Sequence, residues 1–522
     1  MGTKQGSAYV AVDMGSSSGR IMLGTLRGTG AEGVPSAPSM TIREVARFAN
    51  TPLRTAQGLS WDLDAFRRFL EAGLRDAVAA AAAEGSAIRG IGVDSWGVDY
   101  ARLDEAGELR AFVRHHRDAD PDLAAETSRG LDVGDAYERT GVLDQAINTA
   151  HQLRQDARAG IGSDGDTAIL IADLVVHLLT GRVAAERTLA STTALLDRRD
   201  DAWSGRLLAD YGAEVRLPEL VSPGDFAGGT SPDLTTRIGA EAPLPVYYVT
   251  GHDTAAAFAA VTAAAPREPT GPPDGSAPSA GSAAGRSWGV VSCGSWAVVG
   301  LAVPQPILTS EARQRGFTQE LGAEGDTLLV KNLSGMWLLQ ELTREWAAED
   351  GLATWPLAAL QELLAGARES PYRGRFDPAD PSLQAPGDLS RRIGDGCEAA
   401  GHDRPRDRIE TVRAVLVSLA AAYARALAEA AELAGTTVDA VRIVSGGSRN
   451  TVLCELTARY TGLPVVAGPP EASARGVLLQ LAVAAGELPS LAVARTIDID
   501  DGETAGHLGV PFRPEHQEDT HD

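Results

Sequence analysis

Short apolar runs that end on a carboxylate recur along the chain, and three of them end on Asp13, Asp94 and Asp253. The runs are rich in small and β-branched residues and are bounded by turn residues, which is typical of buried strands. The predicted strands are residues 9–13, 21–23, 88–94, 169–172, 245–253, 441–444 and 465–466, with a strand, a turn and a second strand over 288–303.

Apolar residues at helical spacing follow most of these strands. In residues 64–84 they include Phe66, Phe69, Leu70 and Leu74, which share one face of a helix. The predicted helices are residues 64–84, 174–179, 254–261, 335–346, 408–434, 450–461 and 472–485. Strands that alternate with helices predict an α/β protein.

A strand, a turn of small residues and a second strand occur twice, around Gly15-Ser16 and around Gly294-Ser295. A chain of 522 residues is also too long for one ordinary core. We therefore expect two lobes, each beginning with one of these hairpins. Two similar lobes around a nucleotide cleft are the layout of actin-like ATPases.

The expected division is an N-terminal lobe over residues 1–245, a C-terminal lobe over 246–490 and a polar tail over 491–522. Residues 262–287 consist of Pro, Gly, Ala and Ser with almost no apolar residue to bury. This composition predicts a disordered insert, with an ordered surface loop as the alternative. The tail is predicted to fray from Pro511 onwards.

Charge and cysteine content narrow the class of protein. The formal net charge is -23 at pH 7, which a nucleic acid or an anionic membrane would repel, so both are excluded as partners. Cys293, Cys397 and Cys454 form no CxxC pair and no metal spacing. No signal peptide or apolar membrane span is visible, so the sequence predicts a reduced, cytoplasmic protein.

The turn after Asp13 is a candidate phosphate-binding loop. Gly15 to Gly19 offers backbone N–H groups and serine hydroxyls to phosphate oxygens, and Asp13 could hold Mg²⁺ through water. The loop lacks the Gly-Lys-Ser/Thr end of a Walker motif, and a strand rather than a helix follows it. An exposed hairpin turn is the alternative interpretation.

Asp253 is a candidate general base. A carboxylate at the end of a strand could accept a proton from a substrate hydroxyl as that hydroxyl attacks a γ-phosphate. An aspartate that caps the following helix is the alternative, and it is a common position for this residue.

Two other loops have compositions that suit ligands. Residues 94–99 combine two carboxylates with Trp96 and Gly97, which suits a sugar, or alternatively a plain turn with a core-facing indole. Residues 445–447 follow a late strand and contain paired glycines, which would let an adenine or ribose lie against the backbone, although an ordinary turn has the same composition. His115 and His116 are predicted to lie in a solvated basic loop.

The order of these segments carries more information than any one of them. AVDMGSSSGR, GVDSWGVDY, VTGHDTAAA, SCGSW, VKNLSGMWLLQ and VSGGSRN follow one another along the chain, and GPPEASARG comes later. This set resembles the FGGY carbohydrate kinases, and within them the kinases of L-rhamnulose. The resemblance extends from about Tyr9 to Leu488 and omits the insert and the tail.

The resemblance implies two actin-like, ribonuclease H-like lobes with the active site in the cleft between them, and ATP and Mg²⁺ as cofactors. It implies Asp253 as catalytic base and Asp13 as the carboxylate near the metal. Phosphate-binding positions are implied at Ser16, Ser17, Ser18, Gly19 and Arg20. Sugar-contacting positions are implied at Gly97, His252, Asp253, Thr254 and Asn332, and nucleotide-contacting positions at Ser295, Gln340 and Gly446.

This chain departs from the family pattern at three places. Ser295 stands where a threonine is usual and keeps the hydroxyl, and Ser445 stands where the first glycine of a triplet is usual. Ser95 stands where a threonine is often found.

The implied reaction transfers the γ-phosphoryl group of ATP to the 1-hydroxyl of L-rhamnulose. A kinase of another ketose, such as fuculose or xylulose, and a sugar-responsive regulator without catalysis are the alternatives. The sequence is compatible with a monomer or a homodimer.

Overall fold

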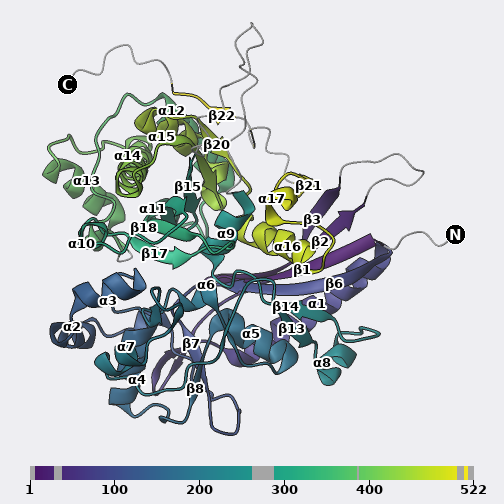
Figure 1. The fold of residues 1–522 in the computed structure, drawn as a ribbon. Helices are drawn as coiled ribbons and strands as arrows, with labels where there is room; N and C mark the ends of the chain where they lie inside the picture. Colours follow the sequence, from purple (N-terminus) through teal and green to yellow (C-terminus); the bar gives the residue numbers. More distant parts are fainter. Residues whose placement is uncertain are drawn as a thin grey trace, which may run out of the picture. The chain divides into compact units, whose positions relative to one another are not determined.

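The computed structural model describes residues 6–28, 38–261, 287–384, 387–502, 509 and 511–514, and Figure 1 shows its elements. The chain forms two compact units. The first comprises Met1–Val261, Val303–Leu329 and Ala472–Glu503, and the second comprises Thr262–Ala302, Val330–Glu471 and Thr504–Asp522. These units are discontinuous, whereas the sequence analysis divides the chain into continuous lobes. Residues 262–286 of the expected insert lie outside the described residues.

The first unit is built on a mixed sheet in which strand β1 is central. Strand β1 pairs antiparallel with β2 and parallel with β6. The strands in spatial order are β13 (Phe226–Gly229), β14 (Pro245–Tyr247), β6 (Ser86–Ser95), β1 (Gly6–Met14), β2 (Ser18–Arg27), β3 (Ser39–Ala49) and β21 (Asp498–Asp500).

Helices cover both faces of this sheet, so β1 is buried on both sides. Side chains alternate across a strand, and Val10 and Val12 enter one core with Phe66 of helix α1 (Leu63–Ala83). Tyr9 and Ala11 enter a second core with residues of α16 (Ala472–Ala484). Burial on both faces explains why the strand reads as a continuous apolar run.

Helix α16 packs against the sheet and against α9 (Asp253–Val261), which lies beside it in Figure 1. Two glycines of β6 face this helix: a Cβ on Gly92 would lie 3.1 Å from Val477, and one on Gly90 would lie 3.2 Å from Leu481. Where α16 crosses α9, a Cβ on Gly476 would lie 1.9 Å from the carbonyl oxygen of Ala256. The approach of the two helices therefore depends on a glycine.

The remaining elements of the first unit surround this layered core. Its short strands are β4 (Leu53–Thr55), β5 (Gly58–Ser60), β7 (Tyr100–Leu103), β8 (Thr167–Leu170), β9 (Ala185–Glu186), β10 (Leu196–Asp197), β11 (Ala202–Trp203), β12 (Leu220–Val221) and β17 (Thr318–Leu321). Its other helices are η1 (His116–Asp118), α2 (Pro121–Gly130), α3 (Val133–Thr140), α4 (Thr149–Ala159), α5 (Ile171–Thr180), α6 (Arg187–Ala190), α7 (Gly205–Asp210), α8 (Pro232–Arg237), α10 (Ser310–Gln314) and α17 (Leu491–Ala494).

The second unit repeats the central motif of the first. Strand β15 pairs antiparallel with β16 and parallel with β19, as β1 pairs with β2 and β6. Its strands in spatial order are β18 (Thr327–Ser334), β16 (Trp296–Val303), β15 (Ser287–Cys293), β19 (Val438–Val444), β20 (Val465–Ala467) and β22 (Pro511–Phe512). Its helices are α11 (Trp337–Glu349), α12 (Leu357–Glu369), η2 (Pro381–Gln384), α13 (Leu389–Ala399), α14 (Arg408–Ala434), η3 (Gly446–Arg449) and α15 (Thr451–Thr461).

Helix α14 is the one helix among the described residues that is long and apolar enough to cross a membrane. However, 67% of its most apolar stretch is buried inside the protein. Val415, Leu419 and Tyr423 are fully covered, so α14 has the burial of a core helix.

Three element boundaries differ from the sequence prediction. Strand β14 ends at Tyr247 rather than at Asp253. The residues that follow pair with β6 only through an isolated bridge, between Ser95 and His252, so they do not form a continuous strand. Helix α5 already begins at Ile171, within the predicted strand. Residues 511–512 do not fray, since they pair with β20.

We expect Gly476→Ala to destabilise the protein by roughly 1–3 kcal/mol, because the new methyl group overlaps the Ala256 carbonyl and forces α16 away from α9. The thermal unfolding midpoint should fall. Gly130→Ala is the matched control, since a Cβ there meets nothing within 4 Å. A Gly476→Ala protein as stable as the Gly130→Ala protein would contradict this account of the packing.

Candidate functional site

Three carboxylates meet at the carboxyl edge of the first sheet. Asp13 and Asp94 are direct partners in the parallel register of β1 and β6 and point to the α16 face, because they follow Tyr9 and Gly90 at even spacing. Both side chains are buried, while the Asp253 side chain at the start of α9 is 40% exposed. The negative charges of Asp13 and Asp253 act on Asp94.

Arg20 and Ser473 contact Asp13. Arg20 is the partner of Asp13 across β1 and β2, and its guanidinium lies 3.0 Å from Oδ2 of Asp13. The hydroxyl of Ser473, in the first turn of α16, donates to the same oxygen at 3.0 Å. The structure thus joins two predicted residues, Asp13 and Arg20, with a serine that the sequence analysis did not single out.

Asp94 differs from Asp13 because no group of the described residues donates a hydrogen bond to its side chain. Both of its carboxylate oxygens are buried and have no hydrogen-bond partner among the described residues. Burial, together with the charges of Asp13 and Asp253, raises the pKa of Asp94 well above its usual value. An all-oxygen set that includes an unpartnered buried carboxylate fits Mg²⁺, which prefers such ligands.

The segment that leads to Asp253 is held from two sides before it enters α9. Gln480 of α16 accepts from the backbone N–H of Thr250 at 3.0 Å and donates to its hydroxyl. Glu186, the buried last residue of β9, accepts the N–H of Gly251 at 2.9 Å. These bonds fix the backbone immediately before His252 and Asp253.

His252 lies between two acidic side chains. Its Nδ1 is 2.8 Å from Oε2 of Glu320, and its Nε2 is 3.5 Å from Oδ1 of Asp253. Burial by itself would lower the pKa of His252, but Glu320 and then Asp253 more than offset burial and raise it to about 9. The imidazole is therefore protonated at neutral pH.

Asp253 is the first residue of α9 rather than a cap before it. Burial raises the pKa of its carboxyl, His252 lowers it, and Asp13 raises it further, with a net shift upward. The hydroxyl of Thr254 donates to Oδ1 at 3.3 Å. A carboxylate that is partly exposed, oriented by neighbours and more basic than usual is suited to accept a proton.

The turn at Gly97 is strained. Val98 has φ of 71°, which is unusual for a β-branched residue, and a Cβ on Gly97 would lie 2.8 Å from the hydroxyl oxygen of Thr192. Thr149 donates to the Val98 carbonyl at 2.7 Å and helps to hold the turn. Strain of this kind is common where a backbone is shaped for a ligand.

Two predictions for this region are wrong. Asp99 does not offer its carboxylate to a ligand, because it already accepts from Trp61, Trp96 and Gln152 and contacts His116 at 2.8 Å. His115 is not solvated, since it is 2% exposed and stacks on Trp61.

The pKa of His115 falls to about 4 because of burial and the adjacent His116. Asp99, His115 and His116 come close enough to hold a metal ion. However, two indole N–H groups already occupy the Asp99 oxygen on that side, so the group does not fit one.

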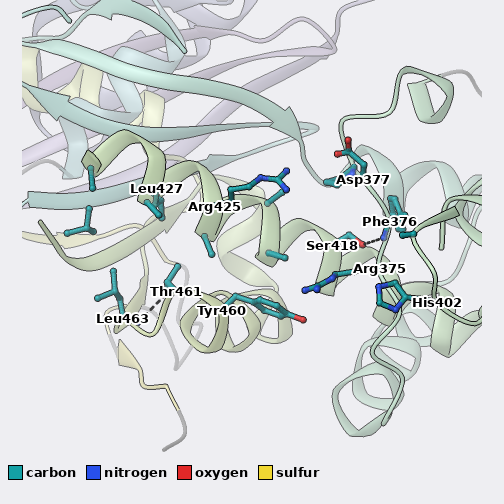
Figure 2. A pocket seen from close by; sticks show the side chains of 18 residues that line it. Arg375, Phe376, Asp377, His402, Ser418, Arg425, Leu427, Tyr460, Thr461 and Leu463 are labelled. Carbon is teal, nitrogen blue, oxygen red and sulfur yellow. Dashed lines mark hydrogen bonds between the residues drawn. The ribbon is translucent and has the colours of Figure 1, made fainter. Parts of the chain in front are cut away.

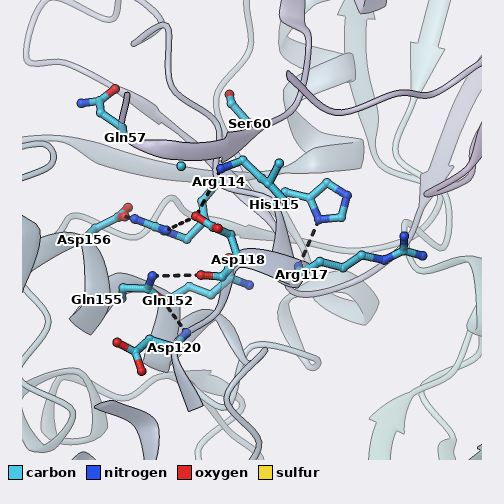
Figure 3. Close-up of polar contacts among 12 residues, drawn as sticks. Gln57, Ser60, Arg114, His115, Arg117, Asp118, Asp120, Gln152, Gln155 and Asp156 are labelled. Carbon is cyan, nitrogen blue, oxygen red and sulfur yellow. Dashed lines mark hydrogen bonds and ion pairs between the residues drawn. The ribbon is translucent and has the colours of Figure 1, made fainter. Parts of the chain in front are cut away.

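A cluster of ion pairs surrounds Arg114, next to His115 in the sequence, and Figure 3 shows Arg114 with Asp118 and Asp156. Arg114 donates to Asp156 at 2.7 Å and contacts Asp118 at 3.3 Å, and Arg102 also pairs with Asp156. The cluster fixes the segment that carries His115 and His116.

The predicted phosphate loop is a tight turn between β1 and β2. The N–H of Gly15 donates to the Ser18 carbonyl at 3.0 Å, while Asn50 donates from its side chain to the Gly15 carbonyl. Ser16 is half-buried and Ser17 is exposed at the tip. Ser18, Gly19 and Arg20 already belong to β2, and a Cβ on Gly19 would overlap the ring of Phe48.

The predicted nucleotide positions come together within the second unit. The Ser295 hydroxyl donates to Gln340 at 3.3 Å, and the backbone N–H of Trp337 donates to the Ser295 carbonyl at 3.0 Å. The hydroxyls of Ser292 and Ser445 lie 3.2 Å apart, which links this turn to the segment of Gly446.

Ser445 has φ of 64° and ψ of -166°, a conformation that essentially only glycine adopts. This explains the glycine that is usual in the family at this position. The serine retains the glycine backbone at the cost of strain.

Asn332 of β18 is exposed in the second unit, beside Lys331, which pairs with Glu429. The second unit also has a groove of about 950 Å³ formed by α14, residues 375–378 and the end of α15, where Arg375, Arg425 and Tyr460 lie (Figure 2). None of the predicted site residues lines this groove, so it is separate from the nucleotide positions.

Sequence reasoning missed the residues that hold the site, namely Glu186, Glu320, Ser473 and Gln480. Gln480 had a usable signal, because a lone amide within the apolar run 477–482 is expected to have a specific partner. Glu320 had none, since only the fold brings it to His252.

The chain is similar to known proteins over most of its length. Residues 38–259 match the N-terminal domain of the FGGY family of carbohydrate kinases, and residues 289–485 match the C-terminal domain. A protein named rhamnulokinase from Bacteroides thetaiotaomicron is 30% identical over 496 residues, covering 94% of this chain and 93% of that protein. A protein of the same name from Klebsiella pneumoniae is 33% identical over 473 residues, covering 90% and 87%.

Solved structures share the fold at lower identity. The xylulose kinase from Rhodospirillum rubrum superposes with a TM-score of 0.70 at 17% identity, covering 98% of this chain and 94% of that chain. Plasmodium falciparum glycerol kinase with ADP has a TM-score of 0.67 at 12% identity, covering 95% and 94%. The predicted α/β class with two lobes is thereby confirmed.

We expect Glu320→Gln to lower the pKa of His252 from about 9 towards its usual value of about 6.5, because burial remains and the main opposing charge is lost. NMR titration of ¹³C-labelled histidine would measure the shift. Glu324→Gln, in the same segment but paired with Arg495, is the control.

The same ion pair makes folding stability depend on pH. Since the folded pKa of His252 exceeds its unfolded value, the stabilisation is complete below about pH 6.5 and is lost as pH rises through about 9. In Glu320→Gln this loss between the two pH values should disappear. A His252 pKa unchanged by Glu320→Gln would contradict the pairing.

Proposed function

The chain belongs to the FGGY family of carbohydrate kinases, and on this basis we propose that it transfers the γ-phosphoryl group of ATP to the 1-hydroxyl of L-rhamnulose. The observation that carries the choice of sugar is the similarity, over nine tenths or more of the chain, to proteins named rhamnulokinase. The meeting of Asp13, Asp94 and Asp253 at one sheet edge supports a site for phosphoryl transfer.

Asp253 acts as the general base in this proposal. Its carboxylate takes the proton of the 1-hydroxyl while the oxygen forms a bond to the γ-phosphorus, and the bond from that phosphorus to the β-phosphate oxygen breaks to release ADP. The Thr254 hydroxyl and the protonated His252 orient the carboxylate. Because transfer depends mainly on positioning and charge neutralisation, one base is sufficient.

The proposed cofactor Mg²⁺ would neutralise charge on the phosphates, and Asp13 would hold it through water, because this ion usually keeps several of its waters. Arg20 and the turn of Ser16 to Gly19 provide positive charge and hydrogen-bond donors for phosphate oxygens. Ser295, Gln340 and Gly446 of the second unit provide the nucleotide contacts.

The sugar contacts proposed are Gly97, His252, Thr254 and Asn332. The strained turn at Gly97 brings backbone groups rather than a side chain to the sugar, and His252 offers a charged donor to a hydroxyl. A small ketose is the partner that these groups suit. We place the enzyme in the cytoplasm, consistent with its three free cysteines.

We expect Asp253→Asn to lower kcat by about 10²–10⁴-fold, because the amide cannot accept the hydroxyl proton. A coupled assay of ADP release measures kcat, and equilibrium titration should show ADP affinity within about threefold of the wild type. Asp122→Asn, at the exposed first turn of α2, is the control for the loss of a helix-terminal acid. Full activity of Asp253→Asn would exclude it as the base.

We expect L-rhamnulose to have the highest kcat/KM in a panel that also contains L-fuculose and D-xylulose. A tenfold preference for another ketose would assign the enzyme to that sugar. Sugar binding without any sugar-dependent ADP release would instead indicate a regulatory protein.

A further inference from the structure

Among the described residues, Asp94 is the one carboxylate of the three whose side chain has no hydrogen-bond partner. It is fully buried and neither oxygen accepts a hydrogen bond from a described residue. Asp99, five residues later in the same segment, is also buried but has a complete set of donors. Burying a carboxyl group without a hydrogen-bond partner is unfavourable. The position of Asp94 therefore lowers the stability of the folded protein.

The direction of the Asp94 side chain follows from the strand register. Gly90 and Gly92 face α16, and Asp94 continues the same alternation along β6. Tyr9, Ala11 and Asp13 of β1 are the register partners of these three residues, in that order. Asp94 and Asp13 therefore project side by side from neighbouring strands.

The charges around Asp94 do not balance. Arg20 is paired with Asp13, and the protonated His252 is closest to Glu320. Asp13 and Asp253 both place negative charge beside Asp94, and Arg20 acts against them. A divalent cation would add positive charge at the point where these carboxylates meet.

We propose that Asp94 is a direct ligand of the divalent cation and forms its site together with Asp13. This proposal rests on the proposed function, because the cation is the one that accompanies ATP. It adds Asp94 to Asp13, the carboxylate already assigned to the cation. At phosphoryl-transfer sites Mg²⁺ is bound through one or two carboxylates together with the phosphates of the substrate. The cation would bind the Asp94 oxygens, which have no hydrogen-bond partner among the described residues.

Binding of Mn²⁺ to the full-length protein in the presence of ADP, followed by electron paramagnetic resonance, tests the proposal without sugar or turnover. Asp94→Asn should weaken Mn²⁺ binding at least tenfold. Asp326→Asn, which alters a half-buried carboxylate elsewhere in the first unit, should bind Mn²⁺ as the wild type does. Wild-type protein that binds no Mn²⁺, or Asp94→Asn that binds it normally, would overturn the proposal.

Thermal unfolding separates a lost ligand from a damaged fold. Without metal, Asp94→Asn should unfold at a midpoint close to that of the wild type, because the change keeps the size of the side chain and breaks no hydrogen bond to a described residue. Mn²⁺ with ADP should raise the unfolding midpoint of the wild type and not that of Asp94→Asn or of a second variant, Asp94→Ser. A variant that is stable, binds Mn²⁺ normally and has lost only sugar affinity would assign Asp94 to the sugar instead.

Because these readouts do not use turnover, they remain valid if the sugar is not L-rhamnulose. Failure of the ketose panel with intact Mn²⁺ effects would refute the proposed substrate alone. Failure of the Mn²⁺ effects with an active kinase would refute the role of Asp94 alone.

Discussion

The dominant constraint on this protein is the confinement of like charges at one edge of a sheet. Asp13, Asp94 and Asp253 are brought together by strand register and by the start of α9, where their repulsion and burial oppose folding. Arg20 and the His252–Glu320 pair supply compensating charge. Bonds from Glu186 and Gln480 then fix the backbone around the cluster, and the glycine contact between α9 and α16 sets the distance between the two helices. In the proposed kinase, a divalent cation held by this cluster would stabilise charge that develops on a phosphoryl group.

The second unit has a different proposed task, which is to present backbone and short polar side chains to a nucleotide. It repeats the hairpin-and-parallel-strand motif and places Ser295, Gln340 and Gly446 in neighbouring turns. Ser445 shows that the backbone of this turn matters more than the identity of the residue, because a serine is held there in a glycine conformation. Val98 in the first unit is a second case of strain beside a predicted ligand contact.

The sequence was sufficient for the parts of the fold that depend on local pattern. The run before Asp13 and the helix of residues 408–434 are found where periodicity predicts them, because burial imposes a clear spacing on each. Residues whose roles depend on distant partners could not be found in this way. Glu320 reaches His252 only through tertiary folding, and His115 is buried by stacking on Trp61 although its own segment is strongly basic. The sequence predicts Asp94 as a carboxylate at the end of a strand. Only the structure shows that its oxygens accept no hydrogen bond from a described residue.

The most direct test of the account is the structure of the product formed from ATP and L-rhamnulose. Correlated ³¹P and ¹H NMR of the reaction mixture would locate the transferred phosphoryl group. The account predicts a phosphate monoester on the oxygen of C1, formed in equal amount to ADP. Release of inorganic phosphate without an ester, or an ester at another carbon, would contradict it.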